Sequence, residues 1–580
     1  MIDITKEAKD SALAIGIDDF EKIRKGNFYY IDKTLMIKDF IEYISEVTLI
    51  TRPRRFGKTL NMTMLREFFD ITKKSVSIFE GLAIMDTEYA NQINTKPVIY
   101  VTFKDCSGEK MYDMCITLAN AMKEEYLKYE ARFKDQVDPE SNDFYDFYRT
   151  YRMFKKARIE INENEEKVYF FDWHLLQTSL ATLIKAVKVF YDQSPLLFID
   201  EYDQPLISAH DFGYREIFSK TFYASFLGLA LKGNTYLGRA LLTGIQRVAK
   251  ESIFSKLNNF IVYSVTSKKY ASYFGLTESE TKAIFEVTGK TFSDDIKRYY
   301  DGYMIGGNNF YNPWSILSYL DEGELKPYWV NTSTNSLIKE AIPKADVYFK
   351  EAFEQLILDG EVEESVNLEA SFVELEESAT LWGLLINSGY LTITKEYRSS
   401  FKRIRIPNEE VKEEIRKIVA RYTKISESRL NELFNALFEA RMDHFLKVYQ
   451  KLVYDYLSVH DIKKQGEQVL PEASYHNFFL GMAISTEGMY ESTSNLEVGE
   501  GRGDVIMTSR QPSLRPHIII EFKRGENVEK LKQEALDQVF EKKYYVKLRG
   551  KVLCVGVSHN KKKCELVYQE IFIDEYGAVK

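Results

Sequence analysis

Three residues near the N-terminus have the types and order of a phosphate-binding loop. Gly57, Lys58 and Thr59 follow an apolar run at residues 47–50 and precede a helix-like spacing of Leu and Met. In such a loop, backbone N–H groups and a helix N-terminus face the phosphates, the lysine neutralises phosphate oxygens, and the hydroxyl is a ligand for Mg²⁺. The usual pattern has a glycine five positions before Gly57, where this chain has Arg52. The spacing therefore indicates either a nucleotide site with an altered entrance or a basic turn that contains these three residues by chance.

A second apolar run, residues 196–199, is followed directly by Asp200 and Glu201. Ligands of open α/β sheets bind at the carboxyl ends of the strands, and adjacent carboxylates there cost desolvation energy unless a cation meets them. We expect Asp200 to hold Mg²⁺ through its water shell and Glu201 to polarise the water that attacks the γ-phosphate of ATP. The alternative is a strand that ends in a solvated acidic turn.

A third strand-like run, "RALLTG", ends in Thr243 and is followed by Gln246 and Arg247. Thr243 is placed to act as a polar sensor of the γ-phosphate, and Arg247 as an accessory residue, although an ordinary exit from a strand would look the same. In the first loop, Arg54 and Arg55 add positive charge. We hypothesise that their guanidinium groups take over part of the phosphate neutralisation that is lost with the glycine.

A second candidate site lies near the C-terminus. Asp504 is followed 17 residues later by Glu521, and Lys523 comes two positions after that. Residues two apart on a strand share a face, so Glu521 and Lys523 project together while Phe522 points the other way. We expect Asp504 and Glu521 to bind Mg²⁺, for which Mn²⁺ could substitute, and Lys523 to orient or activate the water that hydrolyses a phosphodiester. The alternative is a surface salt bridge on a hairpin.

The elements that must position these residues follow from the periodicity of the 580-residue chain, which is too long for one hydrophobic core. Between residues 47 and 260, short apolar runs alternate with long helical stretches, which predicts a parallel sheet wrapped by helices. After residue 260 the sequence pattern becomes mostly helical, with a winged segment around "SGYLTITKEYRSSFKRIRIPNEEV". The chain then ends in a small α/β pattern. We predict four domains: residues 1–265, an ATPase-like domain; 266–340, a helical lid; 341–470, a helical connector; and 471–580, a small α/β domain.

The amino-acid composition limits the classes of protein to which this chain can belong. Hydrophobic residues make up 45% and charged residues 28%, which is typical of a folded soluble chain. We expect no zinc site, because the four cysteines form no C-x-x-C pair. No apolar run is long enough for a membrane span and the N-terminus is charged, so we expect a cytoplasmic protein without a membrane partner. The net charge of −9, with lysines gathered near the C-terminus, restricts any nucleic-acid contact to a local surface.

Taken in order, several phrases resemble the prokaryotic AAA-ATPase-like proteins that carry a C-terminal PD-(D/E)XK nuclease-like domain. They are "IGIDDFEKIRKGNFYYIDKT", "TRPRRFGKT", "LLFIDEYDQPL", "LLTGIQRVAKESIFSKLNNF", "YDGYMIGGNNFYNPWSILSYL", "YWVNTSTN", "SGYLTI", "IPNEEV" and "SNLEVGEGRGD". The resemblance runs almost from end to end. It implies a P-loop NTPase fold followed by a restriction-endonuclease-like α/β domain. It also makes Arg52 a usual variant of this loop.

The resemblance implies roles for further residues. Tyr30, Asp32 and Lys33 would pack near the nucleotide base. Exonuclease-type members of the nuclease superfamily carry a Gln and a Tyr on the following helix; here these would be Gln538 and Tyr544, at a looser spacing than usual. The additional upstream acid would be Glu497, with Glu500 as the competing candidate.

The sequence thus predicts an ATP- and Mg²⁺-dependent protein that cleaves nucleic acid, DNA in the first instance, in a manner that depends on or is regulated by ATP. The competing interpretation is a nucleotide-controlled switch whose C-terminal domain binds nucleic acid or a partner without cleaving it. A homo-oligomer is compatible with either. The sequence does not select the trigger or the shape of the substrate.

Overall fold

The computed structural model describes residues 13–247, 260–329, 341–342, 345–369, 377–396, 400–422, 425–456, 475, 478–479, 482–483, 486, 488–498, 501–560 and 563–580. The chain forms two compact units. The first comprises Met1–Ala341 and Glu363–Val411, and the second Ile342–Val362 and Lys412–Lys580. Each unit contains one of the two candidate sites.

The first unit is built on a five-stranded sheet in which every pairing is parallel. Its strands are β1 (Val47–Thr51), β2 (Val98–Thr102), β5 (Leu196–Asp200), β6 (Arg239–Gly244) and β7 (Phe260–Tyr263), in the order β2-β5-β6-β1-β7. All residues of β1 and β5 are buried. These continuous apolar runs form strands because both faces of the sheet are covered by helices.

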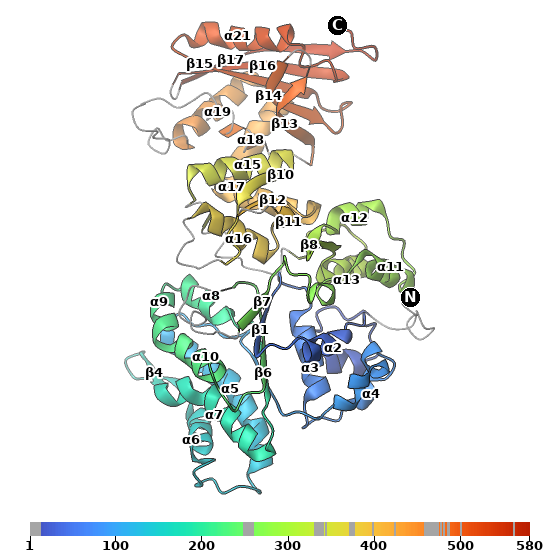
Figure 1. The fold of residues 1–580 in the computed structure, drawn as a ribbon. Helices are drawn as coiled ribbons and strands as arrows, with labels where there is room; N and C mark the ends of the chain where they lie inside the picture. Colours follow the sequence, from blue (N-terminus) through green and yellow to red (C-terminus); the bar gives the residue numbers. More distant parts are fainter. Residues whose placement is uncertain are drawn as a thin grey trace. The chain divides into compact units, whose positions relative to one another are not determined.

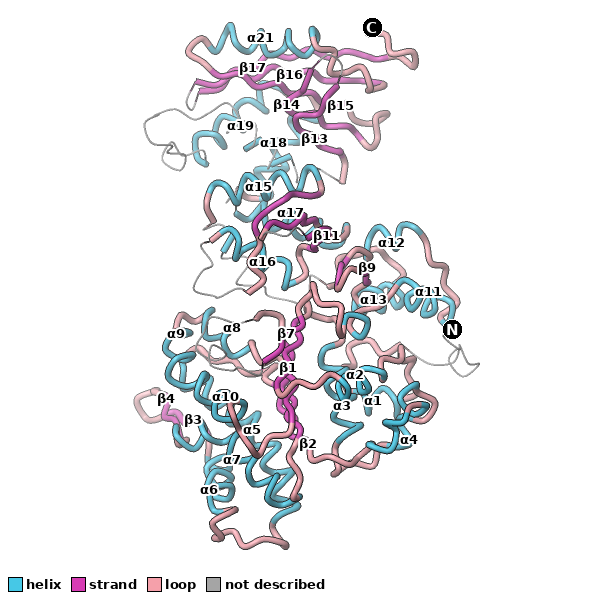
Figure 2. Tube along the Cα trace, viewed as in Figure 1, coloured by secondary structure: helices cyan, strands magenta, loops and turns pink. Residues whose placement is uncertain are grey.

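Figure 1 shows this sheet with helices on both sides, and Figure 2 separates the strands from the helices by colour. On one side lie α2 (Leu35–Glu42), α3 (Lys58–Phe69) and α4 (Val76–Phe79), preceded by α1 (Phe20–Lys25). On the other side lie α5 (Met111–Phe133), α6 (Tyr145–Lys156), α7 (Trp173–Tyr191) and α10 (Ala224–Leu231). The shorter α8 (Gln204–Asp211) and α9 (Arg215–Phe218) precede α10, and a hairpin of β3 (Arg158–Ile161) and β4 (Lys167–Phe170) precedes α7.

The rest of the first unit is mostly helical. It contains α11 (Glu278–Val287), α12 (Asp294–Tyr300), α13 (Pro313–Glu322) and α16 (Ser378–Ser388), with a small hairpin of β8 (Tyr303–Ile305) and β9 (Asn308–Phe310). The strands β10 (Glu361–Ser365), β11 (Thr392–Glu396) and β12 (Phe401–Arg405) form a three-stranded sheet in the order β10-β12-β11. The antiparallel pair of β11 and β12 lies where the winged segment is predicted.

The second unit carries a mixed sheet in the order β13-β14-β15-β16-β17, in which only β15 and β16 are parallel. The strands are β13 (Tyr490–Val498), β14 (Gly501–Ser509), β15 (His517–Arg524), β16 (Gly550–Asn560) and β17 (Lys563–Ile573). The helices are α15 (Val347–Asp359), α18 (Glu427–Phe438), α19 (Met442–Tyr456) and α21 (Val528–Glu541), while α17 (Glu409–Tyr422) contains the passage from one unit to the other.

Alternation along β15 explains how the mixed sheet is buried on both faces. Ile518, Ile520 and Phe522 share a hydrophobic core with residues of α18 and α19. Ile519, on the opposite face, packs with Leu536 and Val539 of α21. A strand covered on both faces reads as an unbroken apolar run, which is why "HIIIEF" shows no alternation in the sequence.

The predicted fold class is confirmed: a parallel five-stranded sheet in the N-terminal part, a helical middle and a mixed C-terminal sheet. The four domain boundaries stay a prediction. Within the ranges given above, no helix combines the length and the apolar character that crossing a membrane requires.

Candidate nucleotide and nuclease sites

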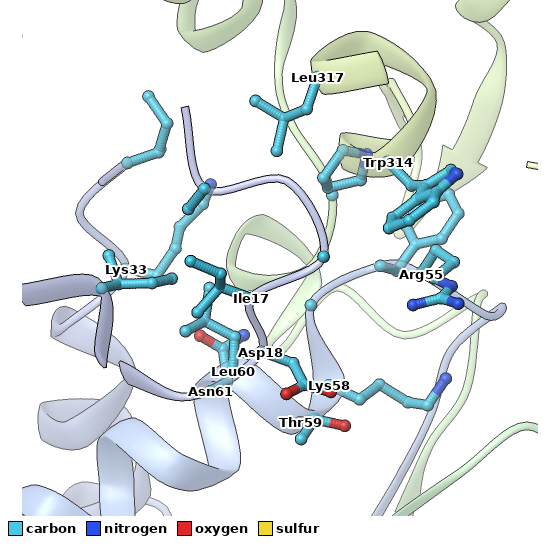
Figure 3. A pocket seen from close by; sticks show the side chains of 18 of the residues that line it. Ile17, Asp18, Lys33, Arg55, Lys58, Thr59, Leu60, Asn61, Trp314 and Leu317 are labelled. Carbon is cyan, nitrogen blue, oxygen red and sulfur yellow. The ribbon is translucent and has the colours of Figure 1, made fainter. Parts of the chain in front are cut away.

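The loop between β1 and α3 opens into a cavity of about 490 Å³ at the carboxyl edge of the parallel sheet. Gly57 is the N-cap of α3 and has φ +83°, a left-handed conformation that glycine adopts without strain. Lys58 and Thr59 begin the helix and line the cavity, as Figure 3 shows. The predicted strand-loop-helix arrangement is therefore present, with a helix N-terminus at the cavity wall.

Lys58 is 6% exposed, and its Nζ donates to the carbonyl oxygens of Arg52 (3.1 Å) and Pro53 (2.9 Å). Burial lowers the pKa of Lys58, while the nearby carboxylates of Glu201 and Asp200 act to raise it. The ammonium group is held inside the loop by backbone oxygens. This places a cation where the loop would receive phosphate oxygens.

Asp200 is fully buried at the carboxyl end of β5, and it joins β6 to the first turn of α3. Its Oδ2 accepts from Thr59 Oγ1 at 2.7 Å, and its Oδ1 accepts from Thr243 Oγ1 at 2.5 Å. These bonds form because β6 lies between β1 and β5 in the sheet. Burial raises the pKa of Asp200, while the two hydroxyl donors act to lower it. Thr243 thus supports Asp200 from within the sheet, and its role as a phosphate sensor stays a prediction.

Glu201 lines the cavity directly after Asp200. Its φ is +53°, a left-handed value that costs a residue with a side chain about 1 kcal/mol or more. Burial raises the pKa of Glu201, and the charge of Asp200 raises it further, with Lys58 acting in the opposite direction. A carboxylate with a raised pKa at the cavity wall has the properties of a general base for a water molecule.

Hard oxygen donors at this edge of the sheet fit Mg²⁺. The hydroxyl of Thr59 and the carboxylate of Asp200 are already 2.7 Å apart, and Mg²⁺ in phosphate sites keeps several waters while using one or two protein oxygens. The donor set of this structure therefore agrees with the ion that the sequence predicts.

Arg52 has a different function from the glycine that it replaces. Its side chain is fully buried, and its Nη1 donates to the carbonyl oxygens of Thr51 (2.7 Å), Tyr263 (3.0 Å) and Ser264 (2.8 Å). Burial lowers the pKa of this guanidinium. The side chain fastens the start of the loop to the end of β7. It contributes to loop position and does not line the cavity.

Arg54 and Arg55, by contrast, both line the cavity. The guanidinium of Arg55 lies 4.4 Å from the ring centre of Trp314 in α13, in a cation–π contact that Figure 3 displays. The carbonyl oxygen of Arg54 accepts from Nε1 of Trp329 at 3.1 Å. The arrangement favours the hypothesis that these arginines supply positive charge to the ligand, and that hypothesis stays open to test.

Tyr30, Lys33 and apolar side chains such as Ile17 and Leu317 also line the cavity. Lys33 Nζ lies 2.5 Å from Glu280 Oε1 and 2.7 Å from the carbonyl oxygen of Ser272. That Tyr30 and Lys33 pack near a base stays a prediction. Asp32 is not among the lining residues, because its carboxylate accepts from Thr34 and from the N–H of Ala83.

In the second unit, the carboxylates of Asp504 and Glu521 interlock across two neighbouring strands. The register Val505–Ile520 places Asp504 opposite Glu521. The N–H of Asp504 donates to Glu521 Oε2 at 3.1 Å, and the N–H of Phe522 donates to Asp504 Oδ2 at 2.8 Å. Glu521 is only 2% exposed. Backbone N–H donors therefore hold the two carboxylates next to each other. The burial of Glu521 argues against the alternative of a surface salt bridge on a hairpin.

The face on which this pair lies follows from strand alternation. Glu521 shares its face with Ile519, which packs against α21, so the carboxylates lie on the α21 side of the sheet. Lys523 is two positions further and belongs to the same face. Phe522 points to the opposite face and joins the core with α18 and α19, as predicted.

Comparison with known families now gives both sites a context. Residues 14–254 match the family model described as "Predicted AAA-ATPase", and residues 470–569 match the model of the PD-(D/E)XK nuclease superfamily. The chain carries an AAA-ATPase-like domain and a C-terminal PD-(D/E)XK nuclease-superfamily domain. An "Uncharacterized protein in vnfD 5'region" from Azotobacter chroococcum mcd 1 is 26% identical over 416 residues, which span 69% of this chain and 68% of that protein.

Within the nuclease-superfamily domain, Gln538 contacts the carboxylate pair, and Tyr544 contacts Gln538. Gln538 Nε2 donates to Glu521 Oε1 and lies 3.1 Å from the hydroxyl oxygen of Tyr544. Burial raises the pKa of Tyr544, and the charges of Glu521 and Asp504 raise it further. The looser spacing in the sequence does not separate the two side chains, because the chain turns back after α21 ends at Glu541.

The additional acid of the nuclease-superfamily domain is not identified by the structure. Glu497 lies on β13, where its backbone pairs with Arg502 of β14. Glu500 lies outside the described residues. In the described part of the chain, no cluster of three or more His, Cys, Asp and Glu side chains is arranged to hold a metal ion. The pair Asp504 and Glu521 fits an ion that completes its coordination with water and phosphate oxygens.

The nucleotide cavity also has lining residues that sequence reasoning missed. Asp18 and Lys104 line the cavity and form an ion pair at 3.0 Å, and Gln204 and Trp314 line it as well. The phrases "IGIDDF", "LLFIDEYDQPL" and "NPWSIL" contain three of these four, so the resemblance held a signal for Asp18, Gln204 and Trp314. The aromatic stretch around residues 299–311 packs into a core, with Tyr300 and Tyr311 buried.

Gln246 and Arg247, which follow β6, turn away from the nucleotide cavity. Gln246 is 2% exposed and bonds to Asn387 and Ser388, while Arg247 forms an ion pair with Glu369. Neither residue is among those that line the cavity. The accessory role of Arg247 toward the nucleotide stays a prediction.

Proposed function

We propose that this chain hydrolyses ATP and that its nucleotide cycle controls Mg²⁺-dependent cleavage of nucleic acid, with DNA as the first substrate to test. The observation that carries the proposal is the interlocked pair of Asp504 and Glu521. Burial of the Glu521 carboxylate costs desolvation energy, and a divalent cation next to the pair would offset that cost. The Thr59–Asp200–Thr243 cluster supports the ATPase part.

In the ATPase site, Lys58 would neutralise phosphate oxygens together with Arg54 and Arg55. Thr59 and Asp200 would hold the water shell of Mg²⁺, which supplies charge neutralisation at the β- and γ-phosphates when bound. Glu201 would accept the proton of the attacking water. Its raised pKa improves the match to a proton acceptor that works near neutral pH.

In the nuclease site, Asp504 and Glu521 would hold Mg²⁺ or Mn²⁺, which lowers the pKa of a bound water and shields the phosphate when present. Lys523 would orient the attacking water from the same face of β15. Gln538 would keep Glu521 in place through its amide donor. The exposed Lys542, Lys543 and Lys547 follow α21 and add positive charge beyond Gln538, which would attract the phosphate backbone of nucleic acid.

A cleavage assay with the full chain tests the proposal. Supercoiled DNA, linear DNA and RNA are incubated with Mg²⁺ or Mn²⁺, with and without ATP. We expect the wild-type protein to cut DNA, and the ATP response to disappear in Lys58→Ala. In Lys523→Ala we expect cleavage to fall about 100-fold or more while ATP hydrolysis persists. The matched controls Lys25→Ala and Lys530→Ala, with side chains 65% and 73% exposed, should behave like the wild type.

Two results decide between the proposal and the non-cleaving switch. If no nucleic acid is cut under any condition while ATP is still hydrolysed, the nuclease assignment is rejected. In that case binding of DNA measured with and without ATP tests the switch. Cleavage that Lys523→Ala does not reduce would reject the assigned site. A cytoplasmic location and the oligomeric state are separate predictions.

A further inference from the structure

The end of α16 contacts the nucleotide-binding elements although it lies far from them in the sequence. The helix ends at Ser388, and Gly389 caps it with φ +90°. These residues begin the phrase "SGYLTI", which has no role in either site as described so far. They belong to the same compact unit as the AAA-ATPase-like domain but lie outside residues 14–254 of its family match.

Gly389 contacts the phosphate-binding loop itself. A Cβ added at Gly389 would lie 2.9 Å from Cβ of Pro53, which is too close for an ordinary contact. The positive φ independently favours glycine there. Pro53 is also the residue whose carbonyl oxygen accepts from Lys58 Nζ. The helix end therefore packs directly against the residue that holds the loop lysine.

Asn387 and Ser388 contact the turn that follows β6. Asn387 Nδ2 donates to Gln246 Oε1 at 3.2 Å, and Gln246 Nε2 donates to Ser388 Oγ at 3.1 Å. Asn387 and Gln246 are each 2% exposed. Hydrogen bonds between buried amides are costly to lose, because the remaining partner is left unsatisfied.

The same turn is fixed from the other side by residues that follow Asp200. Asp203 accepts from the N–H groups of Ile245 (2.9 Å) and Gln246 (2.8 Å), and the hydroxyl of Tyr202 donates to the carbonyl oxygen of Gln246 at 2.7 Å. The backbone of the turn is thus fixed to β5, and the Gln246 side chain connects it to α16. The turn directly follows Thr243, which bonds to Asp200.

We propose that Asn387, Ser388 and Gly389 form a positioning wall of the ATPase site. This wall sets the phosphate-binding loop through Pro53 and the turn after β6 through Gln246. The inference rests on the proposed ATPase function and goes beyond it, because it makes turnover depend on a helix more than 130 residues after the last nucleotide-site strand at Arg239–Gly244. These residues act through Pro53 and Gln246 and are not among those lining the cavity.

Steady-state ATP hydrolysis by full-length variants tests this wall. We expect Asn387→Ala and Gln246→Ala each to lower kcat about tenfold, with the KM for ATP changed less than about threefold, since Lys58 and the cavity remain intact. The double variant should be no slower than the slower single variant, because the two changes break the same contact. Asn435→Ala and Gln450→Ala, on exposed faces of α18 and α19, are the matched controls.

A pair of isosteric substitutions separates positioning from packing. Ser388→Thr keeps the hydroxyl that accepts from Gln246, whereas Ser388→Val has the same shape without it. We expect Thr to retain most of the kcat and Val to lose about as much as Gln246→Ala. Equal kcat in the Thr and Val variants would overturn the hydrogen-bonding role, as would multiplicative effects in the double variant.

Failure of this inference is distinguishable from failure of the ATPase proposal. Lys58→Ala and Glu201→Gln are measured in the same assay. If both reduce hydrolysis while Asn387→Ala leaves kcat unchanged, only the positioning wall is rejected. If neither reduces hydrolysis, the assigned ATPase site is rejected, and the wall with it. Thermal unfolding of each variant identifies those that fail to fold, and for these the Thr and Val pair at Ser388 decides.

Discussion

At the residue scale, Glu201 combines a raised pKa with a left-handed backbone. Its φ of +53° is uncommon for a residue with a side chain, and it lies directly after the buried Asp200. The strain is tolerated because the surrounding sheet and the turn at Tyr202 and Asp203 fix the backbone. In this left-handed conformation, Glu201 lines the cavity.

Substitution of Glu201 should separate stability from activity. Glu201→Gln and Glu201→Gly both remove the charge, so we expect both to lose ATP hydrolysis. Glycine relieves the left-handed strain, and Glu201→Gly should therefore be more stable than Glu201→Gln by about 1 kcal/mol. Denaturant unfolding of the two variants measures the difference. A glutamine variant equal to or more stable than the glycine variant would show that the backbone at this position is not strained.

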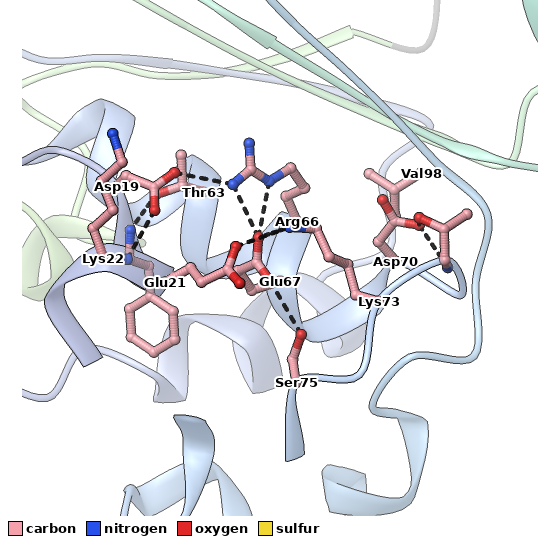
Figure 4. A network of polar contacts seen from close by, with 12 residues as sticks. Asp19, Glu21, Lys22, Thr63, Arg66, Glu67, Asp70, Lys73, Ser75 and Val98 are labelled. Atoms are coloured by element: carbon pink, nitrogen blue, oxygen red, sulfur yellow. Dashed lines mark hydrogen bonds and ion pairs between the residues drawn. The ribbon is translucent and has the colours of Figure 1, made fainter. Parts of the chain in front are cut away.

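At the element scale, a network of charged groups fixes α1 to α3, as Figure 4 shows. Glu67, with a side chain 1% exposed, lies 2.9 Å from Arg66 Nη2 and 2.8 Å from Lys73 Nζ. Arg66 also pairs with Asp19, and Lys73 with Glu21. Because α1 follows the cavity residue Asp18 and α3 starts at Lys58, the network fixes two walls of the nucleotide cavity relative to each other.

Lowering the pH should weaken this network, because it protonates the carboxylate of Glu21. Hydrogen bonds from Lys25 and Lys73 lower the pKa of Glu21 from 4.5 to about 2. The folded state therefore gains stability from the ionised carboxylate above pH 4.5 and loses that gain as the pH falls toward 2. We expect Glu21→Gln to cost about 1 kcal/mol at pH 7 after allowance for solvent screening.

Urea unfolding of wild type and Glu21→Gln at a series of pH values measures this. The difference in unfolding free energy should shrink as the pH falls from about 4.5 toward 2. Glu216→Gln, which removes a 71% exposed carboxylate paired with Lys220, is the control and should have little effect at any pH. A difference for Glu21→Gln that does not depend on pH would contradict the assignment.

At the scale of the whole molecule, the mixed C-terminal sheet is not independent of the helices before it. One hydrophobic core joins Leu433 and Phe434 of α18 and Tyr449 of α19 to Ile520 and Phe522 of β15. The predicted boundary at residues 470 and 471 divides this core. A sheet face that loses such a cover exposes apolar surface at a cost of roughly 25 cal/mol for each Å².

Fragments of the chain test this dependence. We expect residues 412–580 to unfold cooperatively and residues 471–580 to be unfolded or aggregated when expressed alone. Thermal melts followed by circular dichroism, and limited proteolysis, compare the two. A cooperative transition in the shorter fragment would show that the sheet needs neither α18 nor α19, and would support the predicted boundary as an independent domain limit.

The sequence by itself determined the parts of this protein that depend on local patterns. Apolar runs followed by "GKT" and "DE" predicted strands of the parallel sheet, and the two-residue period of a strand predicted that Glu521 and Lys523 share a face while Phe522 packs on the other. These inferences succeed because strand periodicity and the order of strand, loop and helix depend on the types of a few neighbouring residues.

Only the tertiary structure decided the contacts between distant segments. Nothing near Arg52 in the sequence indicates that its guanidinium binds the end of β7, and nothing near Gln246 indicates a bond to Asn387, 141 residues away. The spacing of Gln538 and Tyr544 is looser than usual, and only the turn after α21 shows that the two side chains meet. Such contacts depend on how separate elements pack, and packing is set by the whole core.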